Sequence, residues 1–229
     1  KGHEPKGIRL DSGDLAYLSK QARKMLDDAG YPDAIICASG DLDEYLITSL
    51  KNQGAKLDLW GVGTKLITSA DMPALGGVYK LSALYPKEGG EIPKIKLSDN
   101  SDKITNPAFK DVFRIYDNKT GKAEADLIVV RGEEIDESKP LTVFHPKETW
   151  KKTTFTDYTV RPLTVKVMEK GRLVYKLPSL KEISAYAEKE KESFWDEYKR
   201  PDNPHVYKVD LSQKLFDIKN KLISEIRSN

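Results

Sequence analysis

The segment Arg9-Leu10-Asp11-Ser12-Gly13-Asp14 places charged and hydroxyl side chains at the end of a predicted strand, Gly7–Asp11. Because side chains alternate along a strand, Arg9 and Asp11 are expected on one face, which would otherwise be apolar core. Burial of both charges is costly unless they pair or meet a ligand. One interpretation is an internal Arg9–Asp11 ion pair. The other is a site in which Arg9 faces an anionic or aromatic ligand and Asp11 accepts hydrogen bonds from sugar hydroxyls.

A glycine-rich turn, Gly61-Val62-Gly63-Thr64, follows another predicted strand at Leu57–Trp60. Glycines allow unusual dihedrals and close approach, and a following helix start adds N–H groups and partial positive charge. Backbone donors at Gly63 and Thr64 can therefore converge on a phosphate monoester. The same turn is also common as a plain tight connection.

Asp41 follows the buried strand predicted at Ala34–Ala38, within the cluster Ser39-Gly40-Asp41. It precedes a predicted helix, and Glu44 stands three residues later in a capping-box pattern. Helix capping alone would explain Asp41. Its position at a neighbouring strand end equally allows it to reach a ligand beside Asp11.

These clusters depend on repeated strand-then-helix units in residues 1–85. Strands are expected at 7–11, 34–38, 57–60 and 78–81, with helices at 14–29 and from about 42. Three crossovers of this length imply parallel strands with helices outside. In a partial barrel and in an open sheet alike, functional residues gather at the C-terminal ends of the strands.

Residues 86–229 have a different pattern, in which turns separate strand-like segments. Hairpins are expected from 112–116 with 125–130, and from 163–167 with 173–175 around Lys170-Gly171. Ser179 with Glu182 and, later, Ser212 predict the starts of two closing helices. The predicted fold class is therefore α/β, with parallel strands in 1–85 and a mixed α/β region in 86–229.

The composition excludes several classes of function. Thirty-eight basic and 36 acidic residues leave a formal charge of +2, so no global field attracts nucleic acid or anionic membranes. The single cysteine excludes an internal disulfide. No segment approaches a membrane span and no signal peptide is visible, so we expect a cytoplasmic protein. Because the chain starts at Lys1 rather than Met, we expect a fragment.

Five motifs of the sequence resemble those of nicotinate phosphoribosyltransferases and follow that family's order. They are GIRLDSGDL at 7–15, ASGDLDE at 38–44, WGVGT at 60–64, LGGVYKL at 75–81, and NPHVYKV at 203–209 with Leu211-Ser212. Any one of them could arise by chance, but five in order, at similar spacing, identify a resemblance to the C-terminal portion of such an enzyme.

The resemblance implies a type II phosphoribosyltransferase, with residues 1–85 as the C-terminal part of an irregular, TIM-like α/β barrel. Such an enzyme forms nicotinate mononucleotide and pyrophosphate from nicotinate and phosphoribosyl pyrophosphate, with coupled ATP hydrolysis. Mg²⁺ would neutralise the departing pyrophosphate, although its ligands stay unassigned. The resemblance also implies a homodimer for the full-length enzyme.

The resemblance makes Arg9 and Asp11 the catalytic candidates, with Arg9 beside the base and ribose and Asp11 on the ribose hydroxyls. Carboxylates near the ribose would stabilise the cation-like sugar formed by displacement at the anomeric carbon. The other substrate-binding residues that it implies are Ser12, Gly13, Gly40 and Asp41 around the ribose, and Gly63 and Thr64 at the 5′-phosphate.

One departure from the family's pattern is important. The histidine that ATP phosphorylates belongs to a segment upstream of Lys1, and neither His145 nor His205 matches it. We therefore expect the chain alone to be catalytically inactive. Base selectivity also depends largely on upstream residues, so an enzyme that uses nicotinamide is an alternative. A noncatalytic phosphate-binding or assembly module is another.

Overall fold

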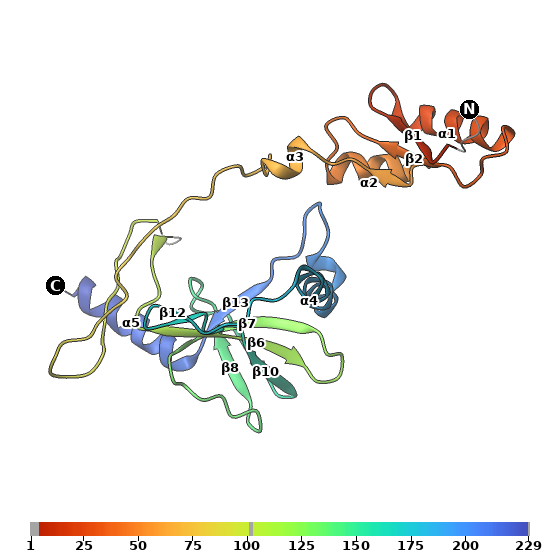
Figure 1. Ribbon diagram of the computed structural model, residues 1–229. Helices are drawn as coiled ribbons and strands as arrows, with labels where there is room; N and C mark the ends of the chain where they lie inside the picture. Colours follow the sequence, from red (N-terminus) through yellow and green to blue (C-terminus); the bar gives the residue numbers. More distant parts are fainter. Residues whose placement is uncertain (1–4, 101–102, 229) are drawn as a thin grey trace. The chain divides into compact units, whose positions relative to one another are not determined.

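The computed structural model describes residues 5–100 and 103–228 (Figure 1). The chain forms two compact units, Lys1–Gly77 and Val78–Asn229. Their assignment to a barrel, expected in 1–85, and to a mixed region, expected in 86–229, stays a prediction. We describe each unit by itself.

The first unit is a three-stranded parallel sheet with two helices packed on one face. Its elements are β1 (Gly7–Leu10), α1 (Leu15–Asp28), β2 (Ile35–Ala38), α2 (Glu44–Asn52), β3 (Leu59–Trp60) and the single turn α3 (Thr64–Ile67), with strand order β1-β2-β3. The predicted parallel pairing of these three strands is confirmed. Its core joins Leu15 and Ala16 of α1 to Ala38, Leu42 and Leu50. Burial of a leucine of this kind contributes about 1.5–3 kcal/mol.

The opposite face of this sheet is open. Ile35 is 44% exposed and Leu59 52% exposed, and register places Arg9, Cys37 and Leu59 in one row across the three strands. The expectation that Arg9 lies in a buried core face is therefore wrong for this chain. No described element of the first unit covers that face, and the Arg9 side chain is 66% exposed.

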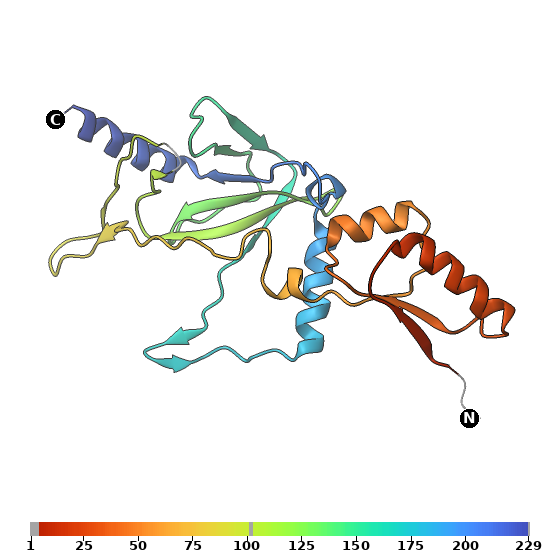
Figure 2. The same ribbon diagram turned by 90° about the horizontal axis from the view of Figure 1, so that it is seen from above.

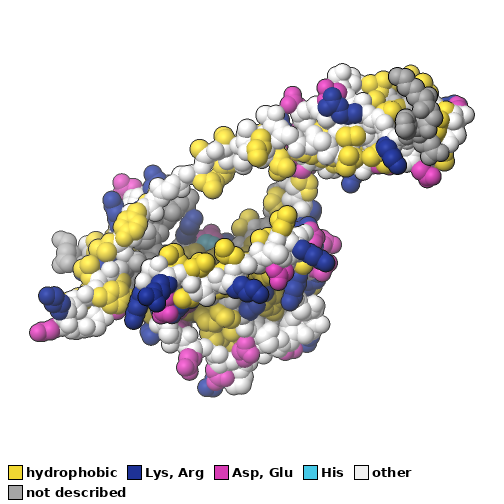
Figure 3. Space-filling view, in the orientation of Figure 1, with side chains coloured by type: hydrophobic (Ala, Val, Ile, Leu, Met, Phe, Trp, Pro, Cys, Tyr) yellow, Lys and Arg dark blue, Asp and Glu magenta, His cyan; other side chains and the backbone are white. Residues whose placement is uncertain are grey.

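The fourth parallel strand expected at 78–81 does not form. Val78 is 79% exposed and Tyr79 fully exposed, and hydrophobic side chains lie exposed along the extended segment that follows α3 (Figure 3). Alternation of apolar residues favours a strand only where a neighbouring strand accepts its hydrogen bonds. Here the ladder ends at β3.

The second unit is built around a mixed six-stranded sheet of order β10-β6-β7-β13-β8-β9. These strands are β6 (Lys110–Asp117), β7 (Ala123–Val130), β8 (Leu141–Phe144), β9 (Lys152–Phe155), β10 (Tyr158–Pro162) and β13 (Lys208–Leu211). β9 and β10 form opposite edges, yet only residues 156–157 separate them in the chain. The sheet therefore curls, and side chains from both edges reach one core around Ile115, Leu127 and Val143.

Turn chemistry explains the hairpins of this unit. The predicted β6–β7 hairpin is confirmed, with a bulge between Ile115 and Tyr116. At Lys170-Gly171 both φ angles are positive, 48° and 76°, as a tight hairpin turn requires. The turn joins only β11 (Met168–Glu169) and β12 (Arg172–Leu173), which project away from the large sheet (Figure 2). The strand predicted at 163–167 is irregular. A further short pair is β4 (Ala83–Leu84) with β5 (Ile92–Pro93).

Both closing helices begin where the sequence predicts. Ser179 and Glu182 form the capping box of α4 (Leu180–Ser193). Ser212 caps α5 (Gln213–Arg227), accepting from the Leu215 N–H at 3.2 Å. Leu215 of α5 is fully buried and packs with Leu211, Ala108 and Val130. A short 3₁₀ turn, Asp196–Tyr198, follows α4.

A network of four charged side chains, the Arg114 network, fixes α4 to the sheet. Arg114 donates to both oxygens of Asp126, at 2.8 and 3.1 Å, and to Glu190 at 3.1 Å. Arg161 holds Glu190 from the neighbouring strand with bonds of 2.8 and 2.6 Å. The bonds to Asp126 raise the pKa of Arg114, and Arg161 lowers the pKa of Glu190.

Candidate functional site

The predicted polar clusters of the first unit meet at one edge of its sheet. Asp11-Ser12-Gly13 follows β1 and Gly40-Asp41 follows β2, and all five residues line one cavity of about 460 Å³. The strands are parallel, so their carboxyl ends lie side by side. The residues selected from the sequence therefore converge at these strand ends, and their functional roles stay predictions.

Asp11 is held by its neighbours but keeps an open oxygen. Ser39 donates its hydroxyl to Asp11 Oδ1 at 2.5 Å, and Arg9 Nη1 lies 3.9 Å from the same oxygen. The side chains of Arg9 and Asp11 are 66% and 60% exposed, so their attraction is weak and screened. Asp11 Oδ2 has no hydrogen bond to any described residue. The carboxylate is oriented and free to accept from a hydroxyl.

Ser39 is a site residue that the sequence reasoning missed. It stood inside a recognised motif, between a buried strand and Gly40, and a hydroxyl at a strand end beside an acid was the available signal. Its backbone N–H donates to Leu10 O at 2.9 Å, so it also joins the ends of β1 and β2. Ser39 thus positions Asp11 rather than merely connecting elements.

Residue 40 must be a glycine because the backbone of Asp11 lies close to it. Its φ is +100°, and a Cβ at this position would lie 2.5 Å from the carbonyl oxygen of Asp11. Backbone cannot move away as a flexible side chain can. The two strand ends therefore sit as close as they do because residue 40 has no side chain.

Replacing Gly40 with alanine is expected to lower the free energy of unfolding by about 2 kcal/mol or more, through positive φ and backbone collision together. Gly54→Ala is the matched control, since φ is +70° there but a Cβ would meet only Lys20, at 3.9 Å. It should cost about 1 kcal/mol. Urea denaturation of both variants measures the difference, and equal losses would contradict the collision.

Asp41 does not cap α2, so the capping interpretation is wrong. The cap is Asp43, whose Oδ1 accepts from Leu46 N–H at 2.8 Å. Asp41 itself adopts a left-handed conformation with φ +48°, which few non-glycine residues do. Its exposed carboxylate makes no hydrogen bond to a described residue and lines the Asp11 cavity. Contact between Asp41 and a ligand beside Asp11 stays a prediction.

The glycine turn closes on β2, but its predicted phosphate ligands lie outside the Asp11 cavity. Gly61 N–H donates to Ala38 O at 2.7 Å. A Cβ at Gly63 would meet nothing within 4 Å, which leaves the backbone of Gly63 and Thr64 accessible. The helix after them, α3, is a single turn, so the expected dipole contribution is small.

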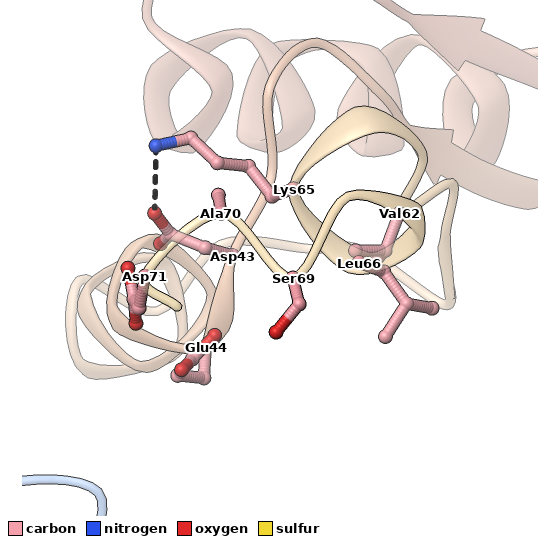
Figure 4. A pocket seen from close by; sticks show the side chains of 8 residues that line it. All are labelled: Asp43, Glu44, Val62, Lys65, Leu66, Ser69, Ala70 and Asp71. Atoms are coloured by element: carbon pink, nitrogen blue, oxygen red, sulfur yellow. Dashed lines mark ion pairs between the residues drawn. The ribbon is translucent and has the colours of Figure 1, made fainter. Parts of the chain in front are cut away.

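A second hollow of about 200 Å³ lies beside the glycine turn (Figure 4). Val62 and Lys65, which flank Gly63-Thr64, line it together with Asp43 and Ser69. Lys65 extends toward Asp43, with Nζ 3.9 Å from Oδ2. Lys65 is thus a cation close to the predicted phosphate position that the sequence reasoning did not select.

Within residues 5–100 and 103–228, no three His, Cys, Asp or Glu side chains gather as a metal cluster. Mg²⁺ commonly needs only one or two carboxylates when phosphate oxygens complete its shell, and Asp11 and Asp41 fit that pattern. His145 and His205 both lie in the second unit. No helix of the described residues could cross a membrane.

The family and the curated relatives that match this chain carry the same name. Residues 109–219 match the family described as nicotinate phosphoribosyltransferase C-terminal domain. The chain is 46% identical to nicotinate phosphoribosyltransferase of Bacillus subtilis (strain 168), over 97% of this chain and 45% of that protein. The enzyme of the same name from Dictyostelium discoideum is 36% identical, over 96% and 39%.

A solved structure is also similar to this chain. The crystal structure of human nicotinic acid phosphoribosyltransferase superposes with a TM-score of 0.70 at 25% identity, over 95% of this chain and 40% of that one. The chain therefore spans less than half the length of the relatives that it matches.

Proposed function

Because this chain belongs to the nicotinate phosphoribosyltransferase family, we propose that it supplies the ribose and phosphate part of an active site for nicotinate mononucleotide synthesis. In this reaction nicotinate displaces pyrophosphate from phosphoribosyl pyrophosphate. The names of the relatives favour nicotinate over nicotinamide as the base. The reaction belongs to the salvage route to NAD.

The observation that supports this proposal is the cavity that Asp11 and Asp41 share. Both carboxylates are exposed and keep oxygens without hydrogen bonds to described residues. Displacement at the anomeric carbon passes through a cation-like sugar, which such carboxylates stabilise. Arg9, beside Asp11, would face the base, and the Gly63-Thr64 backbone would fix the 5′-phosphate and so orient the reacting carbon.

Mg²⁺ would enter this site with the pyrophosphate group. It would neutralise charge on the departing oxygens. Of the three carboxylates that line the cavity, Asp14 caps α1, and Asp11 and Asp41 would contribute to holding the ion. Ser12 and Gly13 complete the substrate-binding set on the β1 side.

The wider proposal includes the rest of the enzyme. We infer that further strands of a TIM-like barrel cover the open face at Ile35 and Leu59, that ATP hydrolysis is coupled to the reaction, and that the enzyme is a cytoplasmic homodimer. The chain by itself is then inactive, because the phosphorylated histidine and part of the base site lie elsewhere.

Calorimetric titration of this chain with phosphoribosyl pyrophosphate and Mg²⁺ tests the proposed site. We expect saturable binding that Gly63→Val abolishes, since its side chain fills the approach to the turn. Gly90→Val is the matched control, because a Cβ there also meets nothing within 4 Å. Circular dichroism verifies the fold of each variant. A folded chain that does not bind, or equal binding by both variants, would contradict the proposal.

A further inference from the structure

The six-stranded sheet of the second unit has a gap beside β13, the last of its strands in the sequence. β13 pairs with β7 at four positions, from Lys208 to Leu211, but with β8 at one only, Leu211 opposite Phe144. Beyond that point the β8–β9 connection diverges from β13. A cavity of about 430 Å³ opens there, within the range of small-molecule sites.

Asp210 lines this cavity from the apolar face of the sheet. Its partner in the neighbouring strand is Leu127, a fully buried core residue on the same face. Asp210 is only 4% exposed and makes no hydrogen bond or ion pair with a described residue. Burial raises the pKa of its carboxyl group. A position of this kind normally holds an apolar side chain.

The carboxylate of Asp210 faces the cavity. The oxygens of Asp210 accept no hydrogen bond from a described residue, although nearby His145 and Lys208 favour the ionised carboxylate. Among the described residues, the one side-chain nitrogen or oxygen that is completely buried without a hydrogen-bond partner is Arg161 Nε. The Asp210 oxygens are therefore not completely buried, and they keep a small exposed area where Asp210 lines the cavity. A buried carboxylate without partners is costly unless a ligand donates to it.

Cations and an aromatic ring line the same cavity. Lys152 and Lys208 form no ion pair with any described residue, whereas Lys151 is paired with Glu148. Trp150 is 75% exposed, which leaves its ring available for stacking. His145 Nδ1 accepts the Glu148 N–H at 2.9 Å, so the backbone orients this ring.

We propose that this cavity binds a nucleoside monophosphate whose base carries an amino group. The ring stacks on Trp150, the amino group donates to Asp210, and the phosphate lies between Lys152 and Lys208. A nucleotide combines the aromatic face, the donor and the anion that these three features require. The site lies wholly in the second unit and is independent of the Asp11 cavity.

Titration of the 229-residue chain with adenosine 5′-monophosphate, followed by calorimetry and tryptophan fluorescence, tests this site. We expect saturable binding, at least tenfold weaker for adenosine, which lacks the phosphate, and for inorganic phosphate, which lacks the base. Trp150→Ala removes an exposed ring and should weaken binding at least tenfold. Lys189→Met, on exposed α4, is the control for Lys152→Met and Lys208→Met, which should each weaken it several-fold.

Asp210→Leu separates a ligand role from a structural one. A leucine completes the apolar face beside Leu127, so we expect the melting temperature of the chain to rise while binding of the nucleotide falls at least tenfold. Unchanged binding in Asp210→Leu or in Trp150→Ala would overturn the proposal. So would inorganic phosphate that binds as tightly as the nucleotide, or no saturable nucleotide binding to the folded chain.

Discussion

Replacing Asp126 with alanine is expected to lower the free energy of unfolding of the second unit by about 3–5 kcal/mol. The Arg114 side chain is only 13% exposed, and Asp126 accepts hydrogen bonds from its Nε and Nη2. Without that carboxylate the charge stays buried with Glu190 alone. Urea denaturation followed by the fluorescence of Trp195, next to the Phe194 ring that stacks on Arg114, reports this loss.

The control for this experiment is Glu188→Ala on α4. Glu188 pairs with Lys191, but both side chains are 64% exposed, so the change should be below about 0.5 kcal/mol. The double variant Arg114→Met with Asp126→Leu removes both charges and should recover most of the stability. A loss below about 1 kcal/mol in Asp126→Ala would show that the network does not hold α4.

Asp11→Asn is expected to lower kcat/KM for nicotinate mononucleotide formation by about 10²–10³-fold, because a neutral amide cannot stabilise a cation-like sugar. The measurement uses this chain mixed with the N-terminal half of the Bacillus subtilis relative, while the chain alone should show no activity. Because the Asp11 side chain is 60% exposed, the melting temperature should change by less than about 2 °C.

Asp28→Asn provides the matched carboxylate. Asp28 is 66% exposed and pairs with Lys24 on α1, so it resembles Asp11 in exposure and pairing but lies away from the cavity. Its activity should stay within twofold of the parent chain. Equal activity of Asp11→Asn and Asp28→Asn would show that the Arg9–Asp11 pair is structural only, and activity of the isolated chain would contradict the shared-site proposal.

Local chemistry made part of this fold predictable. The predicted caps Ser179 and Ser212 each accept from an N–H three residues later in the chain, a spacing that is visible in the sequence. The β6–β7 hairpin follows from two alternating strands around a short polar turn. The positions of Asp11 and Asp41 at neighbouring strand ends follow from parallel pairing.

Other features depended on choices that sequence alone does not determine. Asp41 and Asp43 both precede Glu44 and have the chemistry of a cap, and the left-handed conformations of Gly40 and Asp41 decide in favour of Asp43. Val78–Leu81 alternates like a strand, but it pairs with none of the strands in the part of the chain that the structure describes.

Long-range pairing was least predictable. β13 has four residues, of which Lys208 and Asp210 are charged, and nothing in its pattern indicates a central strand. Its position comes from a partner, β7, about eighty residues earlier in the chain. The burial of Asp210, and with it the second cavity, is invisible until that pairing is known.

The place of β13 in the sheet also orders events during synthesis. β6, β7, β8, β9 and β10 leave the ribosome well before Lys208–Leu211, and they leave an empty slot between β7 and β8. Until β13 pairs with β7 and β8, the edges of these two strands keep unpaired N–H and C=O groups. Strands of other chains can pair with such edges. Nascent chains of this protein therefore expose these edges for longer than their hairpin-rich pattern would suggest.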